Sequence, residues 1–270
     1  LVGAAVALRK DDITGLLAYS TVSLLGTMVL LAGIGGHGAP VALVTLIVAH
    51  ALYKGALFML AGAVDHEAGT RKLSELGGLR REMPRTLVVT SLAALSMAGI
   101  PPLFGFVAKE ELLHAVTHSE LASGLDTLVV AAVVVAAVLG ILYAWRLVGG
   151  IFFGPAAARQ RKHIHDAPLG MLVGPGTLTL LSVILPLGLL PVVSTLLQPA
   201  VIAVAGKAET VTLHLLPTEL SLPLMLSLGA IVVGIALTRF EKQLITVPSP
   251  LPSWLNGDRI YDAAISGLLR

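Results

Sequence analysis

The chain has 270 residues, of which 56% are hydrophobic and only 13% are charged, and its net charge at pH 7 is +2. Soluble domains carry about 25% charged residues, so this composition excludes an ordinary water-soluble globule. The absence of cysteine excludes disulfides, iron–sulfur clusters and thiolate-bound metals, and the small net charge gives no indication of a nucleic-acid partner.

The apolar residues are grouped into stretches, several of which are long enough to cross a bilayer. A helix of about 20 apolar residues spans a hydrocarbon core of about 30 Å. The stretches show no alternation of polar and apolar residues, so they favour helices over a barrel. In chain order they are 1–8, 13–36, 40–63, 86–121, 127–154, 168–198 and 221–240. The sequence therefore predicts an all-α, polytopic membrane protein.

The first residues and the tail of the chain each have a distinctive composition. Residue 1 is Leu, and "LVGAAVAL" has the character of a helix already under way, so we expect a segment of a longer polypeptide. The tail 241–270 is Pro-rich and then amphipathic, which is typical of a segment at the membrane interface.

The stretch 86–121 is long enough for two short helices or for one interrupted crossing. Cytoplasmic loops collect Lys and Arg, so the two topologies can be compared by where the basic residues fall. Two crossings would divide the basic loops between both faces. One crossing leaves only Lys207 on the opposite face and places the following on one face: Arg9, Lys10, Arg71, Lys72, Arg80, Arg81, Arg85, Arg159, Arg161, Lys162, Arg239 and Lys242. We therefore predict one discontinuous crossing.

The segment "AGIPPLFGF" (residues 98–106) supplies the interruption. Pro101 and Pro102 remove two amide donors, and Gly99 and Gly105 loosen the backbone on either side. Irregular backbone at membrane depth is tolerated where it is buried in protein or lines a wet cavity, as in transporters.

Three basic side chains lie deep in apolar sequence. Within 40–63, His50 is about 15 Å and Lys54 about 21 Å from the start of the helix, and their i,i+4 spacing places them on one face. Lys109 follows the proline pair and precedes Glu110 and Glu111. Burial favours the neutral form of an amine, and histidine titrates near neutral pH, so this series predicts a proton path.

Simpler interpretations stay open for each residue. His50 could be a packing residue with a satisfied hydrogen bond, and the two lysines could extend toward an interface. Glu110 or Glu111 could neutralise Lys109 in a structural ion pair. The sequence contains no recognisable hydrolase, nucleotide-binding or metalloprotease motif in its required context, and we predict neither a metal site nor a cofactor.

Four separated segments resemble the antiporter-like superfamily: "DDITGLLAYSTVSLLG", "AHALYKGALFMLAGAVDHEAGTR", "LGGLRREMP" and "SMAGIPPLFGFVAKEELL". This superfamily includes the proton-translocating membrane subunits of respiratory complex I and the large A-type subunit of Mrp-type multi-subunit Na⁺/H⁺ antiporters. The resemblance covers about residues 1–155. "VDHEAGTRKLSELGGL" is similar to the version in the Mrp A-type subunit, as is, more weakly, "RIYDAAISGLL".

The resemblance implies a fold in which each of two inverted five-helix repeats contains one broken helix. Residues 1–154 would form most of the second repeat, 155–240 additional transmembrane helices, and 241–270 an interfacial tail. Lys54 would be the central lysine, His50 its relay histidine and Lys109 the lysine of the broken helix. The family often has lysine where this chain has Thr14 and histidine where it has Leu46, so water would bridge those positions.

The resemblance further implies a multi-pass component of a plasma-membrane, hetero-oligomeric antiporter, not an enzyme. It would exchange a monovalent cation, preferentially Na⁺, for protons and contact other membrane subunits and the lipid bilayer. Two alternatives stay open: a proton-translocating component of a complex I or hydrogenase-type assembly, and a structural component that transports nothing.

Overall fold

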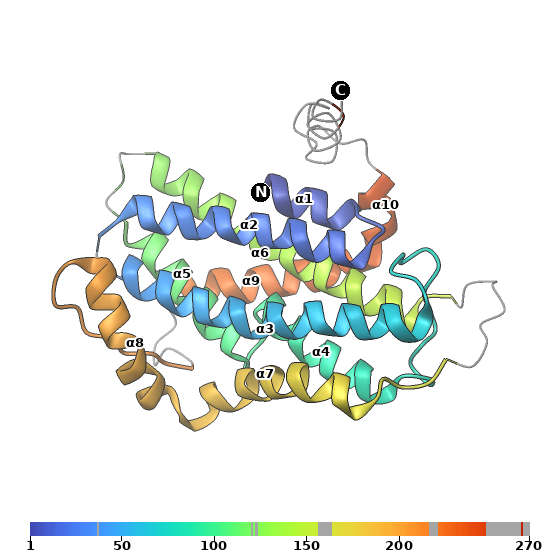
Figure 1. The fold of residues 1–270 in the computed structure, drawn as a ribbon. Helices are drawn as coiled ribbons and strands as arrows, with labels where there is room; N and C mark the ends of the chain where they lie inside the picture. The colour runs from blue at the N-terminus through green and yellow to red at the C-terminus, as the bar shows by residue number, and fades with distance from the viewer. Residues whose placement is uncertain are drawn as a thin grey trace.

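The computed structural model describes residues 1–36, 38–119, 121, 124–155, 164–215, 221–246 and 266. Within these residues the chain folds as a bundle of helices (Figure 1). The helices are α1 Val2–Arg9, α2 Ile13–Ile34, α3 Ala39–Ala68, α4 Pro84–Ala98, α5 Phe104–Thr117, α6 Leu125–Val148, α7 Leu169–Gly188, α8 Leu190–Ala205, α9 Leu222–Leu237 and α10 Glu241–Thr246. A π-helical turn, Gly149–Phe153, extends α6, and a 3-10 turn, Thr238–Phe240, joins α9 to α10.

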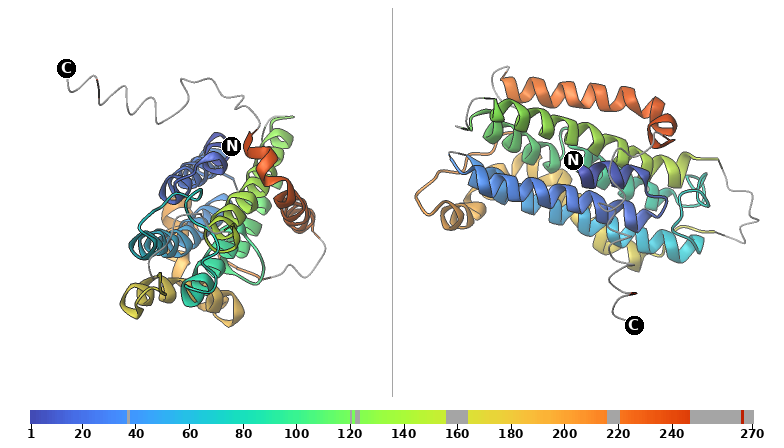
Figure 2. Two further views of the ribbon diagram at one scale, coloured as in Figure 1. Left: turned by 90° about the vertical axis from the view of Figure 1, so that its right-hand side faces the viewer. Right: turned by 90° about the horizontal axis from the view of Figure 1, so that it is seen from above.

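Most of these helices run side by side, and the end-on view in Figure 2 looks along the bundle. Five of the described helical segments are long and apolar enough to cross a membrane. α3 is the central one, because it packs against α2, α4, α5, α7 and α8. In the most apolar 18-residue part of α3, 61% of the residues are buried. In the corresponding part of α2 only 22% are buried, so the rest of its surface is available to lipid or to other protein.

At one end of the bundle the start of α2 contacts the segment that follows α3. We call this the basic end, because Lys10, Arg71 and Arg146 lie there. Asp12 caps α2 by accepting a hydrogen bond from the Gly15 amide at 2.7 Å, and its other oxygen lies 3.1 Å from Arg71 Nε. The Ile13 amide donates to the Arg71 carbonyl at 2.9 Å. Arg146, near the end of α6, donates to the Lys10 carbonyl and pairs with Glu241 at 3.1 Å.

The predicted discontinuous crossing is confirmed. α4 begins at the basic end, where the Arg85 amide donates to Asp166 at 2.7 Å. α5 ends near the start of α3, since a side-chain carbon added to Gly38 would lie 3.8 Å from His114 Nδ1. The two short helices thus cross the bundle once in succession.

The structure refines two of the predicted stretches. α3 extends to Ala68, five residues beyond 63, because polar residues such as Asp65 continue the helix past the apolar segment. The stretch 168–198 contains a helix boundary at Leu189, directly before the Leu190–Pro191 start of α8, where proline disfavours a continuous helix. Of the predicted interfacial tail, α10 is described, whereas 247–265 and 267–270 lie outside the described residues.

Candidate functional site: a lysine cavity at the broken helix

The break between α4 and α5 leaves a backbone carbonyl available at the centre of the bundle. Gly99 ends α4 in the left-handed conformation (φ +79°), which glycine adopts without strain. The Gly99 and Ile100 amides bond back to Ser96 and Leu95, each at 3.0 Å. The carbonyl of Ala98 accepts a hydrogen bond from Lys109 Nζ at 2.7 Å. A side chain of α5 therefore closes the end of α4.

Close packing fixes the two halves of the broken helix against each other. Gly105 lies so near the Ser96 carbonyl that any added side-chain carbon would overlap it. Ser96 Oγ accepts a hydrogen bond from the Gly105 amide at 3.2 Å and lies 2.6 Å from Ser182 Oγ of α7. The break is thus held by α7 as well as by its own two halves.

Lys54 projects from α3 onto one face of α2 and is only 5% exposed. Its ammonium donates to the Leu17 carbonyl at 2.8 Å and to Ser20 Oγ. Ser20 Oγ in turn donates to the Leu17 carbonyl at 2.8 Å, so both acceptors belong to one turn of α2. Neither acceptor carries a formal charge.

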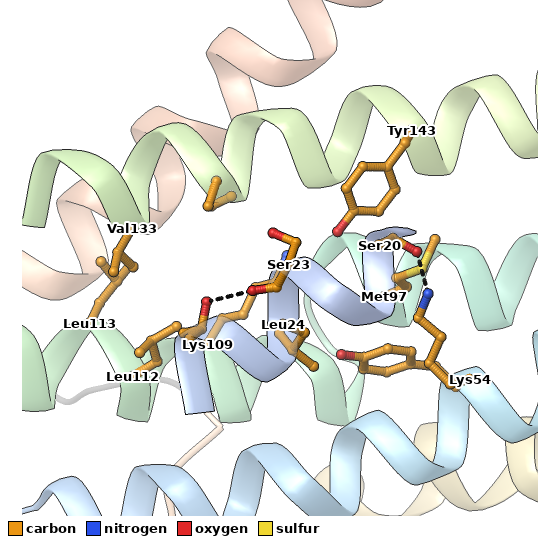
Figure 3. A pocket seen from close by; sticks show the side chains of 14 residues that line it. Ser20, Ser23, Leu24, Lys54, Met97, Lys109, Leu112, Leu113, Val133 and Tyr143 are labelled. Atoms are coloured by element: carbon orange, nitrogen blue, oxygen red, sulfur yellow. Dashed lines mark hydrogen bonds between the residues drawn. The ribbon is translucent and has the colours of Figure 1, made fainter. Parts of the chain in front are cut away.

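Lys54 and Lys109 open on one cavity of about 40 Å³ between α2, α3, α5 and α6. One buried water needs about 10–15 Å³, so the cavity has room for a few. Figure 3 shows Lys54 beside Ser20 of α2. Lys109 of α5 lies farther along the cavity, near Ser23, and the Tyr143 ring enters from α6. The polar lining residues besides the lysines are Ser20, Ser23, Thr27, Tyr53 and Tyr143.

No carboxylate of the described residues lies within 4 Å of either cavity lysine. Glu110 is 7% exposed and directs its carboxylate to α9, where Oε2 accepts a hydrogen bond from Ser227 Oγ at 2.6 Å. Its other oxygen has no partner among the described residues. Glu111 is half-buried and forms no ion pair with Lys109. The structure thus separates both acidic residues from the amine that precedes them in the chain.

The structure places His50 and Thr14 outside the cavity lining. His50 is half-buried one turn before Lys54, and its ring meets the edge of the Tyr53 ring at a centroid distance of 5.6 Å. Its buried Nδ1 has no hydrogen-bond partner among the described residues. Thr14 lies in the first turn of α2, one turn before Leu17. His50 therefore adjoins the cavity through the ring of Tyr53, which lines it.

Sequence reasoning missed the polar lining contributed by α2 and α6. Ser20, Ser23 and Thr27 recur at helical spacing, so their shared face was available as a signal. Tyr143 carried no such signal, because its position in an apolar helix does not reveal which neighbour its hydroxyl meets.

The described helical bundle, with an interrupted crossing and two lysines on one cavity, has the discontinuous helix that is typical of membrane transporters. Residues 1–140 match the profile of the family described as "NADH:quinone oxidoreductase/Mrp antiporter, TM", which is just over half of the chain. The chain belongs to this family and is a multi-pass protein of the plasma membrane.

Proteins similar to this chain are components of cation/proton antiporters by name. A probable K⁺/H⁺ antiporter A/B subunit of Rhizobium meliloti is 33% identical over 98% of this chain and 27% of its own length. An Na⁺/H⁺ antiporter A1 subunit of Staphylococcus epidermidis is 36% identical over 96% of this chain and 35% of its own. A chain of the Mrp complex of a Dietzia species superposes with a TM-score of 0.80 at 32% identity, covering 100% of this chain and 29% of that one. The chain thus spans about a third or less of the length of these relatives.

Proposed function

We propose that the chain is the proton-conducting part of a membrane subunit of a monovalent cation/proton antiporter, with Na⁺ as the preferred cation. Lys54 and Lys109 would carry protons, with His50 as a neighbouring relay. The names of the relatives, which include Na⁺/H⁺ and K⁺/H⁺ antiporter subunits, support exchange over redox-driven pumping. The superposition on a chain of the Mrp complex supports other membrane subunits as partners.

The observation that carries the proposal is the shared cavity, whose two amines have no carboxylate partner. An ammonium held by a carboxylate stays charged, because losing its proton would leave a buried anion without a partner. The acceptors here are the Leu17 and Ala98 carbonyls and the Ser20 hydroxyl, which can accept a hydrogen bond from a neutral amine as well as from an ammonium. Each lysine can therefore alternate between charged and neutral forms, with cavity water completing the transfer.

The basic end would face the cytoplasm, because short cytoplasmic loops are rich in Lys and Arg. Protons would enter from the opposite, outer end, driven by the membrane potential at about 2.3 kcal/mol per elementary charge and 100 mV. Lys109 belongs to the half of the broken helix that leads to the outer end, so it would exchange protons with that side. Lys54 would exchange them with Lys109 through the cavity.

The test is Lys109→Ala in the full-length protein, expressed with its partner subunits in cells that lack their own Na⁺/H⁺ antiporters. We expect loss of salt tolerance and of Na⁺-driven proton movement in membrane vesicles. Lys72→Ala is the matched control, because Lys72 is exposed and its ammonium pairs with nearby Glu75, far from the cavity. Unchanged flux in Lys109→Ala would support the structural, non-transporting role instead. Proton movement that requires a redox substrate rather than an Na⁺ gradient would support the complex I-type alternative.

A further inference from the structure

A buried carboxylate that the sequence analysis did not single out lies at the outer end of the bundle. Glu209 belongs to the segment after α8, which folds back across the start of α3. Two side chains of α8 hold this segment: Gln198 bonds the Glu209 carbonyl and, at 3.0 Å, the Val211 amide, and Ser194 Oγ accepts from the Leu213 amide at 3.2 Å. These bonds fix the position from which the Glu209 side chain extends.

The two oxygens of the Glu209 carboxylate have different environments. Oε1 accepts a hydrogen bond from the Gly38 amide at 2.8 Å and so caps α3. Oε2 is buried and has no hydrogen-bond partner among the described residues, and the whole residue is only 6% exposed. Capping needs one oxygen, and burying a second oxygen without a partner is costly unless it can take up a proton. Capping alone therefore does not account for this carboxylate.

Imidazoles from the broken helix border the same glycine. A side-chain carbon on Gly38 would lie 3.8 Å from His114 Nδ1. His114 stacks on His118 with a centroid distance of 4.3 Å, and both are exposed at the end of α5. His114 follows Lys109 by five residues, a rise of about 7.5 Å along the helix axis. The same spacing turns His114 about 140° around the helix from Lys109. The histidines thus lie between Lys109 and the outer end along the helix axis, and water would join them to the amine.

The chemistry of the three side chains fits proton transfer better than cation binding. Imidazole is the side chain whose ordinary titration lies between about pH 5 and 8, and it exchanges protons readily with a carboxylate. Alkali cations prefer shells of oxygen ligands, which two imidazoles do not supply. Around Lys109 the cavity is lined by Leu112, Leu113 and Val133, with Thr27 as the last polar lining residue of α2, so a polar route outward needs further groups beyond the cavity.

We propose that Glu209, His114 and His118 form an outer proton port that passes protons between external water and Lys109. This inference rests on the proposed function. Four described titratable side chains belong to the outer end of α5 or to the segment of Glu209: His114 and His118, and Lys207 and His214. α3 supplies the Gly38 amide and α8 supplies Gln198, and neither of these groups titrates.

The test is Glu209→Gln in the full-length protein within its complex, assayed in right-side-out vesicles loaded with Na⁺. The amide oxygen of Gln can still accept from Gly38, so the cap persists while the titrating group is lost. We expect Na⁺-driven proton uptake to fall at least about tenfold and one step of its external pH profile to disappear. Glu209→Asp should restore part of both.

Gln198→Ala is the control for a merely structural role, because it loosens the segment but keeps the carboxylate. It should leave the shape of the pH profile unchanged even where the total flux falls. The port is overturned if the flux of Glu209→Gln stays within about twofold of that of the unmodified protein. It is also overturned if the flux falls while the pH profile keeps its shape, as expected for Gln198→Ala. Lys109→Ala in the same vesicles separates the two proposals: an inactive Lys109→Ala with an unaffected Glu209→Gln refutes the port alone.

Discussion

At the ends of the bundle, carboxylates bind backbone amides, whereas in its interior the two lysine amines bind neutral oxygens. Asp166 illustrates the first arrangement: it accepts from the Arg85 amide at 2.7 Å, the Thr86 amide at 3.1 Å and the Thr86 hydroxyl at 2.7 Å. Partial burial alone would raise the pKa of Asp166, but its hydrogen bonds from Thr86, Arg85 and Ala167 lower it overall. Its charge is therefore fixed, and it fastens the start of α4 to the segment before α7.

The cavity lysines show the opposite arrangement. Their acceptors are carbonyl and hydroxyl oxygens, and the nearest acidic residue in sequence, Glu110, is bound to Ser227 instead. Fixed charge thus stabilises the start of α4, whereas the lysine amines of the interior are held by neutral oxygens.

The largest expected effect on proton flux comes from making the positive charge at position 54 permanent. Lys54→Arg keeps a cation at the position, but a guanidinium does not lose its proton at accessible pH. We expect proton flux to fall by about 100-fold or more, as for loss of a positioned proton carrier. Flux is measured in vesicles against Lys72→Arg, which makes the same exchange at an exposed position. Normal flux in Lys54→Arg would show that Lys54 does not need to titrate.

The packing of the break is tested by Gly105→Ala. The added methyl would overlap the Ser96 carbonyl, so the two half-helices must separate. We expect a destabilisation of about 2 kcal/mol or more, seen as a lower melting temperature of the purified protein in detergent. Gly62→Ala is the control, because no atom lies within 4 Å of a side-chain carbon there. Equal melting temperatures for the two variants would contradict the close contact of α4 and α5.

Asp166→Asn should have a smaller effect that depends on pH. The lowered pKa in the folded state means that the carboxylate contributes stability above its unfolded pKa of 3.8, and this contribution is lost as the pH falls through the folded value. We expect a loss of about 1 kcal/mol at pH 7, which shrinks toward zero in strong acid.

Melting temperatures at several pH values check the Asp166 prediction. Asp65→Asn is the control, because the Asp65 side chain has no hydrogen bond to the described residues. A loss in Asp166→Asn that stays constant with pH would mean that the negative charge of Asp166 does not stabilise the start of α4.

The smallest effect is expected from Gly140→Ala. Its methyl would lie 3.4 Å from both Lys109 Nζ and the Tyr143 hydroxyl, so it fits but takes space beside the amine that water would use. We expect a decrease in proton flux of roughly two- to fivefold with an unchanged melting temperature. Gly26→Ala on α2, where nothing lies within 4 Å, should leave both quantities unchanged. Unaltered flux in Gly140→Ala would place the water route away from Tyr143.

Composition and local chemistry were sufficient to predict the bundle, the interrupted crossing and the burial of Lys54. Pro101 and Pro102 break a helix wherever they occur, and a lysine far from both ends of an apolar stretch is deep by arithmetic alone. The helix boundary at Leu189 was missed because hydropathy is insensitive to a change of direction, although Pro191 marks the place.

The partners of the site residues could not be predicted from sequence. Glu110 follows Lys109 directly, yet it bonds a serine 117 positions away, because successive residues of a helix point about 100° apart. Tyr143 reaches the cavity, and Glu209 reaches the start of α3, because elements distant in sequence pack together. A single sequence does not show which distant elements will pack together.

The Lys109 amine sits at the carboxyl end of α4, since its acceptor is the last carbonyl of that helix. Aligned peptide dipoles give such an end about half a negative elementary charge, which favours a cation nearby. This partial charge belongs to the backbone, so unlike an acidic side chain it can never take the proton for itself. The interrupted helix thereby provides a permanent counter-charge for an amine that, under the proposed function, would release its proton again.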